Sequence, residues 1–199
     1  MIKLEFHNDK FHAFLNASFF DDVIGLQLDT GADCTALTLH PLLNIREKGV
    51  IQRIAEFLQR EMLDKKYYLE FRAANRTPIQ GIRCVLHNIS ISGMKIKKFY
   101  FFLSLDYAYS LTLLGKEFFI CCSFFRNYDA DLIVRSFHSE RYLANCRKYL
   151  HTDSLDEYTI DFLSVVEMVQ AYCRSLTDQK EIPAIHWNTV SHSTDSMLS

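Results

Sequence analysis

Glycine, proline and tryptophan are scarce in this chain of 199 residues, which contains six glycines, three prolines and one tryptophan. So little glycine and proline excludes collagen-like and linker-rich chains. A basic excess is also missing, because 22 lysines and arginines stand against 24 aspartates and glutamates and the net charge is -2. Proteins that bind nucleic acid or an anionic membrane by charge normally carry such an excess, so we expect neither kind of partner.

The sequence also lacks a long hydrophobic run. The most apolar stretch, residues 111–125, is interrupted by Lys116 and Glu117 and is too short and too charged to span a bilayer. Residues 1–6 mix charged and apolar side chains, unlike a secretory signal, so we expect none. The six cysteines show no Cys-x-x-Cys spacing, which predicts free thiols in a reducing, cytoplasmic compartment.

What the chain does contain is typical of a folded globular protein. Hydrophobic residues make up 49% of it and charged residues 23%, which excludes a wholly disordered chain. A chain of this length can bury about 70% of its unfolded surface, enough for one domain with an appendage.

Alternating apolar and polar residues predict mainly β-structure up to residue 137. The expected strands cover residues 1–6, 11–19, 23–28, 67–73, 80–90, 95–105, 111–114 and 130–134. Two helices are expected among these strands. One is an insert over residues 50–65, whose charged face is either solvated or narrows a cleft, and the other covers residues 116–125.

Helical patterns take over after residue 137. We expect one helix over 139–150 and a longer one that opens with a capping box at Ser154 and Glu157. Apolar residues three and four apart along the longer helix either pack on the preceding domain or form a dimerising coiled coil. The expected division is a domain over 1–137, a helical C-terminal extension over 138–180 and a polar, disordered tail over 181–199.

The strongest local signal is Asp29-Thr30-Gly31, followed by Ala32 and Asp33, at the end of an apolar strand. The simplest interpretation is a strand-to-turn transition in which the polar side chains satisfy backbone groups. A phosphate loop of the sugar-kinase and actin type also places Asp-x-Gly after a strand. That fold, however, expects serine or threonine in place of Asp33, and a much longer chain with a second phosphate loop.

The turn resembles the active-site motif of retropepsin-like aspartic proteases. Two later segments are similar to that family in the same order. Residues 73–93 resemble its flap hairpin and the following strand, and Leu113-Leu114-Gly115 resembles the apolar-apolar-Gly segment before its late helix. The resemblance covers roughly residues 5–135. It implies a mainly β fold, a retropepsin-like acid-protease closed β-barrel with an inserted helix and an α-helical C-terminal extension, and the activity of an aspartic-type endopeptidase.

Peptide hydrolysis by carboxylates needs two of them close together and sharing one proton, so that a water is activated and the leaving amine is protonated. Asp-Thr-Gly occurs once in this chain, which is about half the size of two-lobed enzymes of this kind. The second carboxylate must then come from a second copy, with Asp29 meeting Asp29 on the axis of a homodimer. The rival hypothesis is a non-catalytic dimer of the same fold that binds peptides or has a regulatory role.

The resemblance also assigns roles to the residues of the active-site loop. Asp29 would be the catalytic acid and base, and Thr30 would lock the two loops of the dimer together. Gly31 would expose backbone groups to the substrate, with Ala32 in the same loop, and Asp33 would bind the substrate backbone.

Outside the loop, the resemblance implies a supporting role for Gly115 and for Lys116. Lys116 would form an ion pair with Asp33, although many relatives have arginine at this position and the two side chains are not equivalent. The flap tip, which would also contact the substrate, falls at Ala74, Asn75 and Arg76.

No metal and no organic cofactor is expected, because the nucleophile is water. The histidines and cysteines of the C-terminal third show no zinc-ligand spacing. Cys121 and Cys122 are expected as core residues of an apolar helix. Cys34, next to the active-site turn, is either a small buried thiol or a site at which oxidation affects activity.

Overall fold

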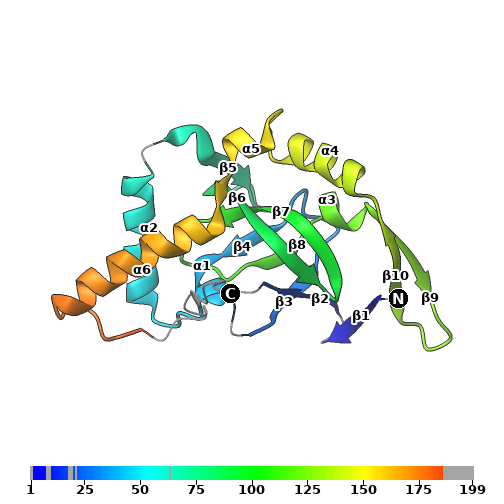
Figure 1. The fold of residues 1–199 in the computed structure, drawn as a ribbon, viewed down its shortest axis with the longest axis horizontal. Coiled ribbons are helices and arrows are strands. Elements are labelled where there is room, and N and C mark those ends of the chain that lie inside the picture. The colour runs from blue at the N-terminus through cyan, green and yellow to red at the C-terminus, as the bar shows by residue number, and fades with distance from the viewer. Residues whose placement is uncertain (1, 8–9, 18–19, 21, 63, 186–199) are drawn as a thin grey trace, which may run out of the picture.

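The computed structural model describes residues 2–7, 10–17, 20, 22–62 and 64–185. In this part of the chain, eleven strands form one continuous sheet, with six helices and one 3-10 turn around it (Figure 1). None of the helices among these residues is long and apolar enough to cross a membrane.

Six of the strands close into a barrel. Around the ring the order is β6, β7, β4, β8, β3 and β2, and β2 then pairs with β6 again. These strands are β2 (Lys10–Asn16), β3 (Ile24–Leu28), β4 (Ala36–Thr38), β6 (Pro78–Ile91), β7 (Met94–Ser104) and β8 (Thr112–Leu114). The closed ring of pairings confirms the predicted mainly β fold with a closed barrel.

The hairpin of β6 and β7 is the longest pairing in the sheet. Its register runs from Gly81 opposite Ser104 to Ile91 opposite Met94. The turn residues Ser92 and Gly93 have positive φ angles of 47° and 83°. Two successive positive φ angles match the right-handed twist of a two-residue hairpin, so this turn fixes the register.

Strand β7 contains a run of buried residues rather than an alternation. Residues 99–103 are each at most 2% exposed. Such a strand needs cover on both faces. Part of that cover comes from the C-terminal helices α4 (Ser139–Tyr149) and α6 (Phe162–Asp178). The hydroxyl of Tyr142 in α4 accepts from the N–H of Tyr100, and the ring of Phe162 in α6 meets that of Phe101 edge to face at 5.7 Å.

The predicted insert is present as α2 (Lys48–Glu61), which follows a short unpredicted helix, α1 (Leu39–Leu43). Its apolar stripe is buried and consists of Val50, Ile51, Ile54, Ala55 and Leu58. The ring of Phe57 stacks on Tyr172 of α6 with centroids 4.1 Å apart. The insert and the C-terminal extension therefore pack against each other.

The chain returns to the barrel through η1 (Lys65–Tyr67) and β5 (Tyr68–Arg72), which pairs with β6.

The prediction of a single helix over residues 116–125 is wrong. Helix α3 (Lys116–Phe119) makes about one turn, and β9 (Cys122–Arg126) follows it, so Cys122 begins a strand instead of lying in a helix. Two adjacent phenylalanines in β9 favour extended structure because aromatic side chains pack well on a pleated surface.

The hairpin that contains β9 projects from the barrel at the right of Figure 1. Its second strand is β10 (Leu132–Phe137), and the Asn127 side-chain oxygen closes the turn by accepting from the N–H groups of Asp129 and Asp131. Strand β1 (Ile2–His7) pairs with the other edge of β10. This order leaves β9 as the outer strand of the sheet.

The prediction of one long helix from Ser154 is also wrong. The chain forms a single turn, α5 (Leu155–Tyr158), then a short strand, β11 (Ile160–Asp161), before α6 begins. The side chain of Ser154 makes no capping hydrogen bond, whereas that of Asp161 accepts from the N–H of Leu163 at 2.9 Å. Asp161 is therefore the true N-cap of the long helix.

The apolar side of α6 is buried within this chain. Its buried residues are Phe162, Val165, Val166, Val169, Cys173 and Leu176. They belong to the same hydrophobic cluster as the barrel interior. Of the two interpretations of this stripe, packing on the preceding domain is the one observed.

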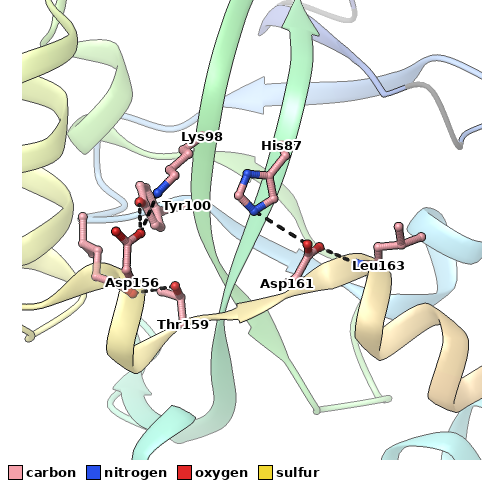
Figure 2. A network of polar contacts seen from close by, with 8 residues as sticks. His87, Lys98, Tyr100, Asp156, Thr159, Asp161 and Leu163 are labelled. Atoms are coloured by element: carbon pink, nitrogen blue, oxygen red, sulfur yellow. Dashed lines mark hydrogen bonds and ion pairs between the residues drawn. The ribbon is translucent and has the colours of Figure 1, made fainter.

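Figure 2 shows the polar contacts that attach the middle of the C-terminal extension to the barrel. The ammonium of Lys98 lies 2.8 Å from a carboxylate oxygen of Asp156, and the hydroxyl of Tyr100 donates to the same oxygen at 3.2 Å. The hydrogen bond from Lys98 lowers the pKa of Asp156. Farther along, His87 lies 3.6 Å from the carboxylate of Asp161. These contacts connect residues 156 and 161 to strands β6 and β7.

The first residues of the predicted tail pack on the insert. Glu181 pairs with Arg53 of α2 at 2.6 Å, and Ile182 is buried. Residues 186–199, which make up the rest of the tail, lie outside the described residues.

Candidate active site

The Asp29 turn lies where β3 leaves the sheet. The backbone N–H of Asp29 donates to the carbonyl oxygen of Leu114 at 3.0 Å, and the N–H of Ala32 donates to the carbonyl oxygen of Asp29 at 3.2 Å. The N–H of Gly31 donates to Oδ1 of Asp29 at 2.9 Å, which orients the carboxylate. Asp29 is half-buried, while Thr30 and Gly31 are exposed. The turn thus presents one carboxylate, held from behind, at the protein surface.

Strand β8 holds the turn in place because it is inserted between the two strands that flank it. It runs parallel to β3, with Leu114 opposite Leu28, and antiparallel to β4, with Leu113 opposite Ala36. Beyond the end of β8, the N–H of Lys116 donates to the carbonyl oxygen of Ala32 at 2.9 Å. Backbone hydrogen bonds therefore bind the turn on both sides to residues more than 80 positions away.

Gly115 is required by close packing at this junction. A Cβ at this position would lie 2.2 Å from the carbonyl carbon and 2.6 Å from the carbonyl oxygen of Cys34. Backbone atoms cannot move aside as a flexible side chain can, so only glycine allows β8 to approach the turn this closely. Its N–H donates to Oγ1 of Thr35 at 3.1 Å.

Asp33 and Lys116 form the ion pair that the resemblance implied. The lysine Nζ lies 2.6 Å from Oδ1 of Asp33, and this hydrogen bond raises the pKa of Lys116. The same Nζ lies 5.2 Å above the ring of Tyr149 at the end of α4. Lysine therefore makes the contact in place of arginine. It contacts one oxygen of the Asp33 carboxylate, whereas arginine can bind both.

Glu117 was missed as a site residue. It is fully buried behind the turn, and its Oε1 accepts from the N–H of Thr35 at 2.7 Å. Its Oε2 has no hydrogen-bond partner among the described residues. Burial raises the pKa of Glu117 to about 7. The available signal was a carboxylate inside the most apolar stretch of the chain.

Of the two interpretations given above for Cys34, the small buried thiol is the one observed. It is 6% exposed, and burial raises its pKa well above the ordinary value. The thiolate, which is the reactive form, is therefore suppressed. All six cysteines are unpaired, as predicted.

The predicted flap residues lie at the tip of the hairpin of β5 and β6. The N–H of Ala73 donates to the carbonyl oxygen of Thr77 at 2.9 Å, and Arg76 turns the chain with a φ of 66°. Ala74, Asn75 and Arg76 are exposed. No hydrogen bond or ion pair among the described residues joins this tip to the Asp29 turn. The structure therefore brings residues 29–33 together with 114–117 and leaves residues 74–76 apart in the single chain.

Gly81, the glycine nearest the tip, has a packing role. A Cβ there would lie 2.2 Å from the carbonyl oxygen of Leu103 and 2.6 Å from the ring of Phe102. It lets β6 approach β7 closely at the end of their hairpin opposite the Ser92–Gly93 turn.

Within the described part of the chain, no three histidine, cysteine, aspartate or glutamate side chains are grouped so that they could hold a metal ion. The groups close to Asp29 are backbone amides, one ion pair and one buried carboxyl group. This arrangement can fix a carboxylate in place and set its hydrogen bonding.

Comparison with known proteins gives similarity only at the level of structure. No protein-family model and no curated protein matches the chain. Among solved structures, the chain is similar to a retropepsin-like aspartic protease from Rickettsia conorii, with 19% sequence identity and a TM-score of 0.38. The similar region covers 67% of this chain and 88% of that one.

Proposed function

We propose that this protein is an aspartic endopeptidase that works as a homodimer, with Asp29 of each copy sharing one proton and activating a water. The observation that carries the proposal is the Asp29-Thr30-Gly31 turn, in which the carboxylate is oriented by the Gly31 N–H and the backbone is tied to Leu114.

The chemistry requires the second copy. Two carboxylates a few ångströms apart cannot both ionise, so the pair carries one proton and its two apparent pKa values belong to the pair. The ionised member takes a proton from water, which attacks the peptide carbonyl, and the protonated member donates to the departing nitrogen. One chain supplies only one such turn.

Two surface features favour self-association. Thr30 and Gly31 are exposed beside Asp29, so the turn is free to face its symmetry mate. The outer strand β9 pairs with β10 alone among the described strands, and an unpaired strand edge is a template for pairing with another chain. A twofold axis would make the same edge available from both copies.

The substrate we propose is an extended peptide. It would lie between the Asp29 turns and the β5–β6 hairpins, with Gly31 and Asp33 on its backbone and Ala74, Asn75 and Arg76 above it. Strand addition recognises the peptide main chain and leaves side-chain preference to neighbouring pockets.

The test is cleavage of a mixed peptide library, from acid to neutral pH, by the wild type, by Asp29→Asn and by Asp178→Asn. Asp178 ends α6 and is exposed, so its variant is a matched loss of one carboxylate elsewhere. We expect cleavage by the wild type and by Asp178→Asn, and none by Asp29→Asn, with all three sedimenting as dimers. A folded wild-type dimer that cleaves nothing would favour the non-catalytic alternative, and a monomer would refute the shared-carboxylate site.

A further inference from the structure

We propose that Glu117 is a positioning residue of the catalytic turn, which it supports as the neutral acid and loosens as the carboxylate, so that activity is lost as the solution turns alkaline. The part of this inference that concerns activity rests on the proposed function. The part that concerns the geometry of the turn does not.

The geometry places Glu117 inside a closed set of contacts. Its Oε1 accepts from the N–H of Thr35 at 2.7 Å, and Oγ1 of Thr35 accepts from the N–H of Gly115 at 3.1 Å. Thr35 and Glu117 are both 0% exposed. Since Gly115 is the N-cap of the helix that carries Glu117, these contacts form a ring that a shift at any one member would open.

This ring is connected directly to the catalytic turn. Thr35 belongs to the segment that leaves the turn, and the carbonyl oxygen of Ala32 in that segment accepts from the N–H of Lys116. On the other side of the turn, the carbonyl oxygen of Leu114 accepts from the N–H of Asp29. A displacement of Thr35 relative to Gly115 would therefore strain the two hydrogen bonds that fix the backbone of the turn.

The surroundings of Glu117 suit a neutral acid. Its Oε2 is buried with no hydrogen-bond partner among the described residues and lies 2.4 Å from the position that a Cβ on Gly115 would occupy. The titratable side chains that interact with it electrostatically come from the segment after the Asp29 turn, from the link between α3 and β9 and from α4. They are Cys34, Cys121, Tyr142 and Cys146. Burial raises the pKa of each of these four groups, so all are uncharged near neutral pH.

Among the described residues, no cationic side chain pairs with the carboxylate of Glu117. The nearest cation along the chain, Lys116, points to Asp33. The amide of Asn145 donates to the backbone oxygen of Glu117 at 3.4 Å, not to its carboxylate. Thr35 and the backbone N–H groups of Glu117 and Phe118 favour the carboxylate form, but burial outweighs them and the pKa is raised. A buried charge without a cationic partner is unfavourable, and the structure can relieve it by letting the carboxylate reach water.

The direction of the pH effect follows from these contacts. Burial raises the pKa of Glu117 from the ordinary 4.5 to about 7. Below that range the group is neutral and the ring is intact. As pH rises through about 7 the group ionises, and the buried negative charge opens the ring.

The experiment compares the wild type with Glu117→Gln, which keeps the acceptor for Thr35 and cannot ionise. The matched control is Glu61→Gln, at the exposed end of α2. Backbone amide shifts of Gly31, Thr35 and Gly115 are followed by NMR from about pH 5 to about pH 9, and kcat/KM for a cleaved peptide is measured over the same range. Each kinetic profile is normalised to its own maximum.

We expect the three amides to titrate together with a midpoint near pH 7 in the wild type and in Glu61→Gln, and not in Glu117→Gln. The alkaline limb of kcat/KM should move up by about one pH unit or more in Glu117→Gln only, a roughly tenfold gain at a fixed pH on that limb. Amides that still titrate in Glu117→Gln, or an alkaline limb that does not move, would overturn the proposal.

The same experiment distinguishes two other outcomes, an inactive wild type and a Glu117→Gln variant that does not fold. If no peptide is cleaved by the wild type, the proposed function fails, and the amide titration alone decides the role of Glu117. If Glu117→Gln does not fold, the carboxyl carbon of Glu117 is titrated in the wild type by carbon-13 NMR. A midpoint near the ordinary 4.5 would then refute the proposal, and a midpoint near 7 that coincides with that of the Gly115 amide would support it.

Discussion

The N–H of Asp29 and the carbonyl oxygen of Leu114 are joined by a 3.0 Å hydrogen bond that continues the parallel pairing of β3 and β8 past the end of β3. The residue that carries the proposed chemistry is thereby the first residue outside the sheet and is still held by it. Any change that separates β8 from the turn should act on Asp29 without touching its side chain.

Gly115→Ala is expected to separate β8 from the Asp29 turn. Its Cβ would meet backbone atoms of Cys34 at 2.2 Å, and overpacking of this kind costs at least about 2 kcal/mol. Gly49→Ala is the matched control, because nothing lies within 4 Å of a Cβ there and Gly49 is helical, so a gain of about 0.5–1 kcal/mol is expected. Urea unfolding of both variants measures the difference. Equal stability of the two would contradict the close approach at Gly115.

The free energy of unfolding should depend on pH through Glu117. Because the pKa of this group is raised in the folded state from 4.5 to about 7, its stabilising contribution is complete below 4.5 and is lost as pH rises through about 7. The difference between these two pKa values corresponds to roughly 3 kcal/mol in the free energy of unfolding. Denaturant unfolding at a series of pH values should show this decline in the wild type and a flatter curve in Glu117→Gln. Parallel curves for the two proteins would exclude a buried titrating Glu117.

Tyr142→Phe should destabilise the attachment of α4 to the barrel. The Tyr142 hydroxyl accepts from the buried N–H of Tyr100 at 2.9 Å, and leaving that donor unpaired costs about 1–3 kcal/mol. Tyr128→Phe removes a hydroxyl from a fully exposed side chain at the β9–β10 turn and should change nothing. Thermal unfolding of the pair is the measurement, and an unchanged midpoint for Tyr142→Phe would show that this hydrogen bond does not contribute.

Most strands of the barrel could be predicted from the sequence because they carry their own signals, whereas the closure of the barrel was implied by the resemblance. Apolar strand patterns and turn residues mark β3, β6 and β7, and the Asp29 turn follows β3 directly. The pairing of Lys116 with Asp33 was likewise implied before the structure, since it depends on matching one short motif to another. Local pattern and short motifs were sufficient for these features.

The helix boundaries could not be predicted in this way. Ser154 with Glu157 has the pattern of a capping box, yet the pairing of Ile160 and Asp161 with β6 extends the chain and moves the N-cap to Asp161. In the same way, pairing of β9 with β10 overrides the apolar run after Phe119. Contacts between distant segments decide both cases, and a local pattern does not contain them.

Glu117 was visible in the sequence only as a charge that breaks an apolar stretch. Nothing local indicates that α3 turns its side chain inward onto Thr35 instead of outward to water. That orientation depends on Gly115 packing against Cys34, which is a property of the folded barrel.

The short strand β11 also sets an order of events during synthesis. It pairs with Cys84 and Val85, on the stretch of the β6 edge between the residues paired with β5 and those paired with β2. A chain still emerging from the ribosome has made β6 long before residues 160–161 exist, so the nascent barrel carries an unpaired edge beside apolar side chains. Such an edge invites pairing with other chains until β11 covers it.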